Sequence, residues 1–102
     1  MKLTIYDANP IIESLKKSRF CPKLVGSIAT KGSSDNDIDI LLPIELQYNN
    51  ENMGELIRNT STFLEYNSVM EKLGFKLIIA PPFAEIDTWK KENILVDIWF
   101  KK

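Results

Sequence analysis

Residues 31–43, KGSSDNDIDILLP, join a turn to an apolar strand and place alternating carboxylates where the two meet. The first part is turn chemistry, a lysine followed by glycine and two serines. From Asp37 the pattern alternates polar with apolar residues and then becomes apolar, which predicts a strand entering the core over residues 37–42. Because side chains two residues apart on a strand point the same way, Asp37 and Asp39 should share one face, with Ile38 and Ile40 on the other.

Carboxylates side by side on one face repel each other, and a bound cation would neutralise that repulsion. Oxygen ligands of this kind suit Mg²⁺ or Mn²⁺. A third acid, Asp97, stands alone in the apolar run ILVDIWF (94–100), where an unpaired charge is costly. If this strand lies beside the first, Asp97 completes a site of three carboxylates. Otherwise Asp37 and Asp39 are solvated residues at a strand start, and Asp97 is an edge-strand charge.

A glycine and a serine upstream supply the second half of the pattern. Gly26-Ser27 lies in a predicted strand over residues 23–28, and a glycine there lets backbone N–H groups approach a ligand closely. Successive amides can bind phosphate oxygens, and the Ser27 hydroxyl can add a donor. Lys31, in the following loop, could reach a phosphate. Ser34 is either a turn residue or a donor to a terminal phosphate.

The remaining elements extend outward from this pair of motifs. Asn9-Pro10 reads as an N-cap and first helical residue, which predicts a helix over residues 10–18. Thr62 and Glu65 form a possible capping box for a second helix that ends at Gly74. Residues 53–58 are a possible helix start. Further strands are predicted over residues 75–80, which should be buried, and over 83–89 and 94–100. We therefore expect a single α+β domain over residues 1–102, with a small mixed or antiparallel sheet of about four to five strands and the helices packed on one face.

Composition limits the chemistry available. The chain of 102 residues has no histidine and one cysteine, which excludes Ser-His-Asp and Cys-His catalysis, histidine-type zinc sites and an internal disulfide. Cys21 is predicted to be a packing residue. The apolar runs are of strand length and the N-terminus lacks an apolar signal segment, so a cytoplasmic protein with no membrane association is the expectation.

The motifs together resemble a known signature. VGSIATKGSSDNDIDILL (25–42) is similar to that of the nucleotidyltransferase superfamily with the DNA polymerase beta fold: an apolar residue, Gly-Ser, a short loop and an Asp-apolar-Asp strand. LVDIW (95–99) resembles the third carboxylate of that family. The short chain looks like the catalytic palm alone, the minimal nucleotidyltransferase type.

The resemblance implies a two-metal mechanism. Asp37, Asp39 and Asp97 would bind two Mg²⁺ ions, with Mn²⁺ as the other candidate, and Asp97 is also a candidate base. An acceptor hydroxyl would attack the α-phosphate of a nucleoside triphosphate such as ATP in line, and pyrophosphate would leave. Gly26 and Ser27 would bind the triphosphate. Family members often carry an arginine just after Gly-Ser, whereas this chain offers only the point charge of Lys31.

Other hypotheses remain open. The chain could be an antitoxin-like or accessory binding module that acts on or masks a small helical partner protein, and an exposed apolar patch including Phe83, Ile86 and Tyr48 would favour this. It could be a polymerase-like palm acting on nucleic acid, or a homo-oligomer. A calcium- or magnesium-binding structural domain is a further alternative. Trp99, which should share a face with Asp97, is either a platform for a base or sugar or an ordinary strand aromatic.

Overall fold

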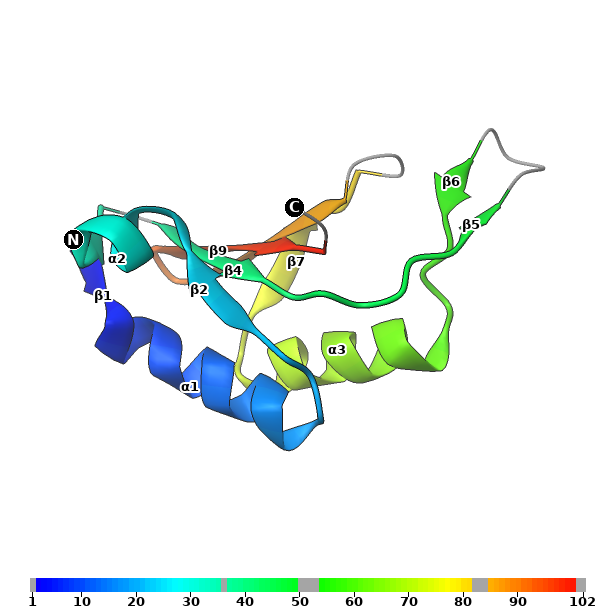
Figure 1. Ribbon diagram of the computed structural model, residues 1–102, viewed down its shortest axis with the longest axis horizontal. Helices are drawn as coiled ribbons and strands as arrows, with labels where there is room; N and C mark the ends of the chain where they lie inside the picture. Colours follow the sequence, from blue (N-terminus) through cyan, green and yellow to red (C-terminus); the bar gives the residue numbers. More distant parts are fainter. Residues whose placement is uncertain (1, 36, 50–53, 82–84, 101–102) are drawn as a thin grey trace.

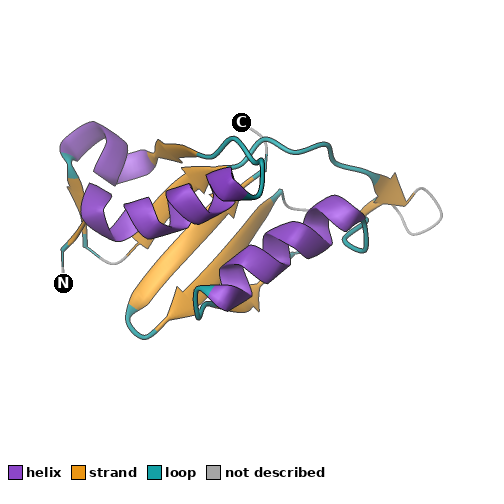
Figure 2. Cartoon of the chain, turned by 90° about the horizontal axis from the view of Figure 1, so that it is seen from below, coloured by secondary structure: helices purple, strands orange, loops and turns teal. Residues whose placement is uncertain are grey.

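The computed structural model describes residues 2–35, 37–49, 54–81 and 85–100 and has the expected α+β architecture. Its centre is a five-stranded sheet in the order β2-β4-β9-β8-β7. The long helices α1 (Ile5–Lys17) and α3 (Ser61–Lys72) cover one face of this sheet, as Figures 1 and 2 show. The sheet strands are β2 (Lys23–Val25), β4 (Asp37–Leu41), β7 (Lys76–Ile79), β8 (Ile86–Lys91) and β9 (Ile94–Trp99).

Two short strand pairs and a third helix surround the main sheet. Strand β1 (Leu3–Thr4) pairs with β3 (Ser33–Ser34), and β5 (Tyr48–Asn49) pairs with β6 (Glu55–Leu56), both antiparallel. The short helix α2 (Gly26–Lys31) follows β2 directly. None of the helices in the described part of the chain is long and apolar enough to cross a membrane.

Strand β4 lies between β2, with which it pairs antiparallel, and β9, with which it runs parallel. The predicted alternation along β4 is confirmed, because Ile38 and Ile40 are fully buried while Asp37 and Asp39 are only partly buried. In the register of the parallel pair, Asp39 lies directly opposite Asp97. The strand that carries the isolated aspartate is therefore the neighbour of the strand that carries the other two.

The core lies between the sheet and the two long helices. Aromatic rings of Phe63, Tyr66, Trp89 and Phe100 pack edge to face at its centre, with centroid separations of 5.2 to 6.1 Å. One charge, that of Asp87, is fully buried beside them.

Asp87 is paired within the core. Its Oδ2 accepts hydrogen bonds from Arg58 Nη1 at 3.0 Å and from the Tyr66 hydroxyl at 2.9 Å, and Arg58 Nη2 lies 2.8 Å from its Oδ1. The Trp89 indole in turn donates to the Tyr66 oxygen at 2.6 Å. A buried carboxylate is tolerated when it is paired and hydrogen-bonded in this way, so this network ties β8 to α3.

The start of α1 differs from the prediction. The helix begins after Thr4, whose hydroxyl accepts from the Tyr6 N–H at 3.3 Å while the Asp7 carboxylate accepts from the Thr4 N–H at 2.8 Å. This capping box satisfies N–H groups at the start of α1, so the helix begins at Ile5 and not at the predicted Pro10. Pro10 consequently lies inside α1 and not at its first position.

Other boundaries also differ. Helix α3 is capped by Thr60, which accepts from the Phe63 N–H at 3.3 Å, and not by the predicted box at Thr62.

Two predicted element types are wrong. The residues of α2 were expected in a strand and a turn. The possible helix start over residues 53–58 is wrong where the structure describes it, because Glu55–Leu56 is a strand. The predicted strand over residues 75–80 is present as β7, but the prediction that it is buried is wrong, because β7 is exposed at the sheet edge. The prediction that Cys21 packs inside is also wrong, since it is exposed.

Candidate functional site

Three carboxylates converge on the sheet face opposite the long helices. Asp37 and Asp39 come from β4 and Asp97 from the adjacent β9, and one oxygen from each lies within 4.8 Å of the others. All three side chains are partly exposed, so an ion could reach them from solvent. The alternation of β4 and the parallel register with β9 are together sufficient to produce this cluster.

Each carboxylate is oriented by one hydrogen-bond donor. Ser34 Oγ donates to Asp37 Oδ1 at 2.7 Å, and Thr88 Oγ1 donates to Asp97 Oδ1 at 2.7 Å. The indole Nε1 of Trp99 donates to the Oδ1 of Asp39 at 3.3 Å. Donors from β3, β8 and β9 therefore hold the three side chains in place. Because the carboxylates are already ordered, binding a metal would cost less side-chain entropy.

The cluster is electrostatically unfavourable without a cation. Partial burial raises the pKa of Asp39 above its ordinary value, the Trp99 hydrogen bond works in the opposite direction, and repulsion from Asp37 and Asp97 raises it further. A divalent cation would reverse this balance because it stabilises the ionised form of all three groups. The candidate metal ligands are carboxylate oxygens. Such ligands suit Mg²⁺ or Mn²⁺, and not a metal that prefers thiolate or imidazole ligands.

Gly26 packs directly against this cluster. Its φ of +72° lies in the left-handed region, and a Cβ built at this position would overlap the Asp39 carboxylate and lie 2.9 Å from the Asp39 Cβ. Only glycine fits such a contact. The sequence motif therefore has a physical basis: the first residue of α2 rests on the middle carboxylate of the site.

A cavity of about 390 Å³ adjoins the carboxylates at Asp37. Three of the predicted nucleotide-binding residues line it, namely Ser27, Lys31 and Ser34. Lys2, Ser33 and Asp35 complete the lining. The structure thus brings the predicted phosphate-binding side chains to one side of the predicted metal ligands, while Gly26 contacts the ligands themselves.

Sequence analysis missed two contributors to this region, Lys2 and Thr88, and did not give Ser34 and Trp99 the role of donors to the carboxylates. Lys2 reaches the cavity through the pairing of β1 with β3, and a pairing of two-residue strands leaves little signal in the sequence. Thr88, Ser34 and Trp99 donate hydrogen bonds to the three carboxylates. The alternation that places Trp99 and Asp97 on one face of β9 is visible in the sequence, whereas the cross-strand position of Thr88 opposite Asp97 is not.

The predicted apolar patch has a different composition in the structure. Tyr48 is 38% exposed and its hydroxyl donates to Glu85 at 2.8 Å, Ile86 is partly buried, and Phe83 lies outside the described residues. Three consecutive exposed apolar side chains instead lie on the edge strand β7, where Leu77, Ile78 and Ile79 are 37%, 47% and 52% exposed.

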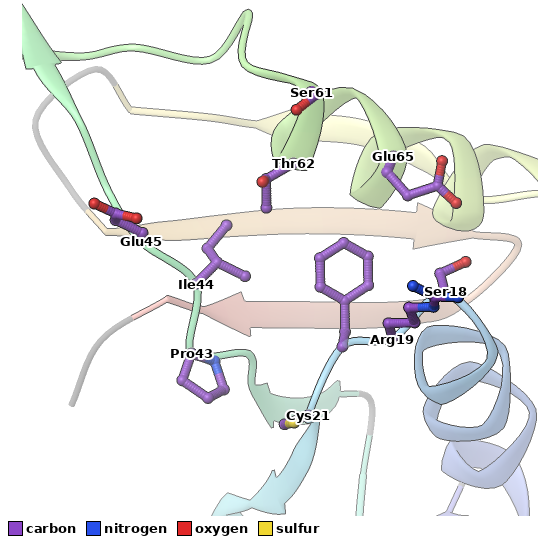
Figure 3. Close-up of a pocket in the computed structure, with 10 residues that line it drawn as sticks. Ser18, Arg19, Cys21, Pro43, Ile44, Glu45, Ser61, Thr62 and Glu65 are labelled. Carbon is purple, nitrogen blue, oxygen red and sulfur yellow. The ribbon is translucent and has the colours of Figure 1, made fainter.

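A separate cavity of about 670 Å³ lies on the helix side of the molecule, shown in Figure 3. It is formed where α1 ends, where α3 begins and where the chain leaves β4, and its charged lining is mixed, with Arg19, Glu45 and Glu65. None of the carboxylates of the cluster lines it. This cavity is therefore distinct from the candidate site and has no comparable set of ligands.

Comparison of the chain with models of known protein families, with curated proteins and with solved structures gave no match. The functional argument consequently depends on the geometry described above and on the short motifs that produce it.

Proposed function

We propose that this chain is a metal-dependent nucleotidyltransferase, which transfers a nucleoside monophosphate from a nucleoside triphosphate to an acceptor hydroxyl. The observation that carries the proposal is the contact between its two motifs. Asp39 lies in register with Asp97 on the neighbouring strand, and Gly26 packs against Asp39 on its other side. A structural cation site would need the carboxylates but would not need a glycine and a hydroxyl-rich cavity beside them.

The residues divide into two groups by position. Asp37, Asp39 and Asp97 would hold two Mg²⁺ or Mn²⁺ ions, which when bound stabilise the charge on the phosphates and activate the attacking hydroxyl. Asp97, which accepts a hydrogen bond from Thr88, would take the proton of the acceptor hydroxyl. The hydroxyl oxygen then forms a bond to the α-phosphorus, and the bond from that phosphorus to the β-phosphate oxygen breaks, releasing pyrophosphate.

The cavity beside Asp37 supports a triphosphate donor. Ser27 offers a hydroxyl donor there and Lys31 offers a positive charge, which are groups that bind phosphate oxygens, while the hydroxyl of Ser34 donates to Asp37. Leu41, two residues along β4 from Asp39, lines a mostly apolar cavity of about 810 Å³ and pairs with Trp99 in the sheet register. The uncharged part of a substrate would find an apolar surface in that direction. A cytoplasmic location would supply both NTP and Mg²⁺.

A second candidate function is that of a binding module, and one observation favours it. Within the described residues, β7 is the last strand at one edge of the sheet and exposes three consecutive apolar side chains, Leu77 to Ile79. Such an edge can accept a strand from another chain. A partner protein or a second copy of this chain would then cover β7, with or without being the acceptor of the transferred nucleotide.

The direct test is transfer of label from each α-labelled NTP. The protein is incubated with Mg²⁺ or Mn²⁺ and a pool of DNA, total RNA and cell lysate, and the labelled species identifies the acceptor. Asp37→Asn and Asp97→Asn are the matched negative controls, because each removes one charge and keeps the side-chain size. Transfer by the wild-type chain and not by these variants is expected. Equal labelling by wild type and variants would reject the assignment of the site.

A further inference from the structure

The N-terminal end of the described chain is fixed beside the cavity at Asp37. Leu3 pairs with Ser34 and Thr4 with Ser33, and Leu3 is only 1% exposed, so its burial anchors the strand. Lys2 immediately precedes this anchor and lines the cavity. Its backbone position is therefore determined by the same β-pairing that places Ser34 against Asp37.

The charges that face this cavity are not paired with one another. Lys2 and Lys31 form no ion pair with any residue in the described ranges, although Asp35 and Asp37 also line the cavity. Two lysines that share a cavity and lack partners repel each other, and an anion bound between them would relieve that repulsion. Asp37 belongs to the proposed metal cluster, so its charge would be taken up there. Asp35 is then the one remaining acid in the cavity lining, against two lysines.

We propose that Lys2 binds the terminal phosphate of the donor and makes the site selective for nucleoside triphosphates over diphosphates. This inference rests on the proposed function, which sets the reacting α-phosphate at the carboxylates. Asp37 and Lys2 both line the cavity, so a phosphate chain that begins at the carboxylates has room to extend through it to this lysine. Lys31 and Ser27 would contact the chain, and Lys2 would bind its terminal phosphate.

The test is a comparison of dissociation constants for NTP and NDP. Calorimetric titration with Mg²⁺ present gives both values for wild type, for Lys2→Met and for Lys17→Met. Lys17 is an exposed lysine in the last turn of α1, about 20 Å from the helix start. The Lys2→Met variant should bind NTP about tenfold more weakly, as expected for loss of one charge-assisted contact, with little change for NDP. Lys17→Met should behave as wild type.

The outcomes separate the two proposals. If wild type binds NTP in a Mg²⁺-dependent manner and Lys2→Met keeps the wild-type ratio of the two constants, the role of Lys2 is rejected while the proposed function stands. If wild type shows no Mg²⁺-dependent binding of any of the four common NTPs, both are rejected. Thermal melting of Lys2→Met checks its fold, because a destabilised variant would weaken NTP and NDP binding alike and would leave their ratio unchanged.

Discussion

Replacing Asp39 by asparagine should make the protein more stable when divalent cations are absent and should remove its stabilisation by Mg²⁺. Asp39 is the middle member of the cluster, and its pKa is raised by burial and by its two acidic neighbours. Asparagine keeps the size of the side chain and an oxygen that can accept from Trp99, so the substitution removes mainly the charge. The residue that would hold the proposed metal is thus a source of instability in the metal-free fold.

The magnitude follows from the separation of the carboxylates. Two charges within 4.8 Å of each other interact by about 1 kcal/mol in a site as open to water as this one, and by more where water is excluded. Asp39 has two such neighbours, so the variant should gain about 1 to 2 kcal/mol of unfolding free energy after allowance for salt screening. In a domain of this size that corresponds to a rise of about 5 °C or more in Tm.

Circular dichroism melts in EDTA and in MgCl₂ at neutral pH measure this directly. Wild type should gain about 1.4 kcal/mol when Mg²⁺ is at ten times its Kd, and Asp39→Asn should gain much less. Gln47→Glu, which adds a charge remote from the cluster, is a control for general effects of net charge. Lower stability of Asp39→Asn in EDTA together with an unchanged response to Mg²⁺ would refute the reasoning.

The pH dependence has a defined sign. Because the pKa of Asp39 is raised in the folded protein, its protonated form contributes stability that is complete below the ordinary value of 3.8. That contribution is lost as the pH rises through the folded-state pKa. In EDTA, wild type and Asp39→Asn should therefore converge in stability at low pH, and the difference between them should open as the pH rises. A difference that is independent of pH would contradict the assignment of its cause.

Three further substitutions test separate contacts. Gly26→Ala should both strain a left-handed backbone and push against Asp39, so we expect a loss of about 2 kcal/mol or more in stability and weaker Mn²⁺ binding. Arg58→Met should cost about 3 kcal/mol in chemical denaturation, because the fully buried Asp87 loses its partner. Trp99→Phe removes the donor that favours ionised Asp39, so its pKa should rise further and Mn²⁺ binding at mildly acidic pH should weaken.

Two of these substitutions have a matched control. Gly32→Ala has a similar φ of +85° but open space around the added methyl group, so it should show the backbone strain without the effect on Mn²⁺. Arg58→Met combined with Asp87→Asn should be less destabilised than Arg58→Met alone, and an equal loss would show that charge is not the cause. For Trp99→Phe, unchanged Mn²⁺ affinity across the acidic range would contradict the role given to the indole.

The sequence was sufficient to predict the centre of the sheet, because burial of every second residue enforces the alternation there. Ile38 and Ile40 had to enter the core, which sent Asp37 and Asp39 to the other face, and the pairing of β4 with β9 then required only that two apolar strands be neighbours. The positions of these aspartates relative to Asp97 could be anticipated for that reason.

The missed features depend on competition between alternatives or on contacts distant in sequence. Thr4, and not Asn9, caps α1 because Asp7 completes a reciprocal pair of hydrogen bonds with it. Pro10 consequently lies inside the helix. The contribution of Lys2 needs the pairing of β1 with β3, and the orientation of Asp97 needs Thr88 from an adjacent strand. Local patterns carry no information about such cross-strand neighbours.

The number of divalent cations bound per chain tests the central claim most directly, since it does not require the acceptor to be known. Mn²⁺ is titrated into the protein in the presence of an NTP analogue that cannot be cleaved between the α- and β-phosphates, and binding is followed by electron paramagnetic resonance. The account predicts two Mn²⁺ per wild-type chain, and fewer in Asp39→Asn, because the two-metal mechanism requires both ions at these carboxylates. Absence of nucleotide-dependent Mn²⁺ binding, or the same stoichiometry in the variant, would contradict it.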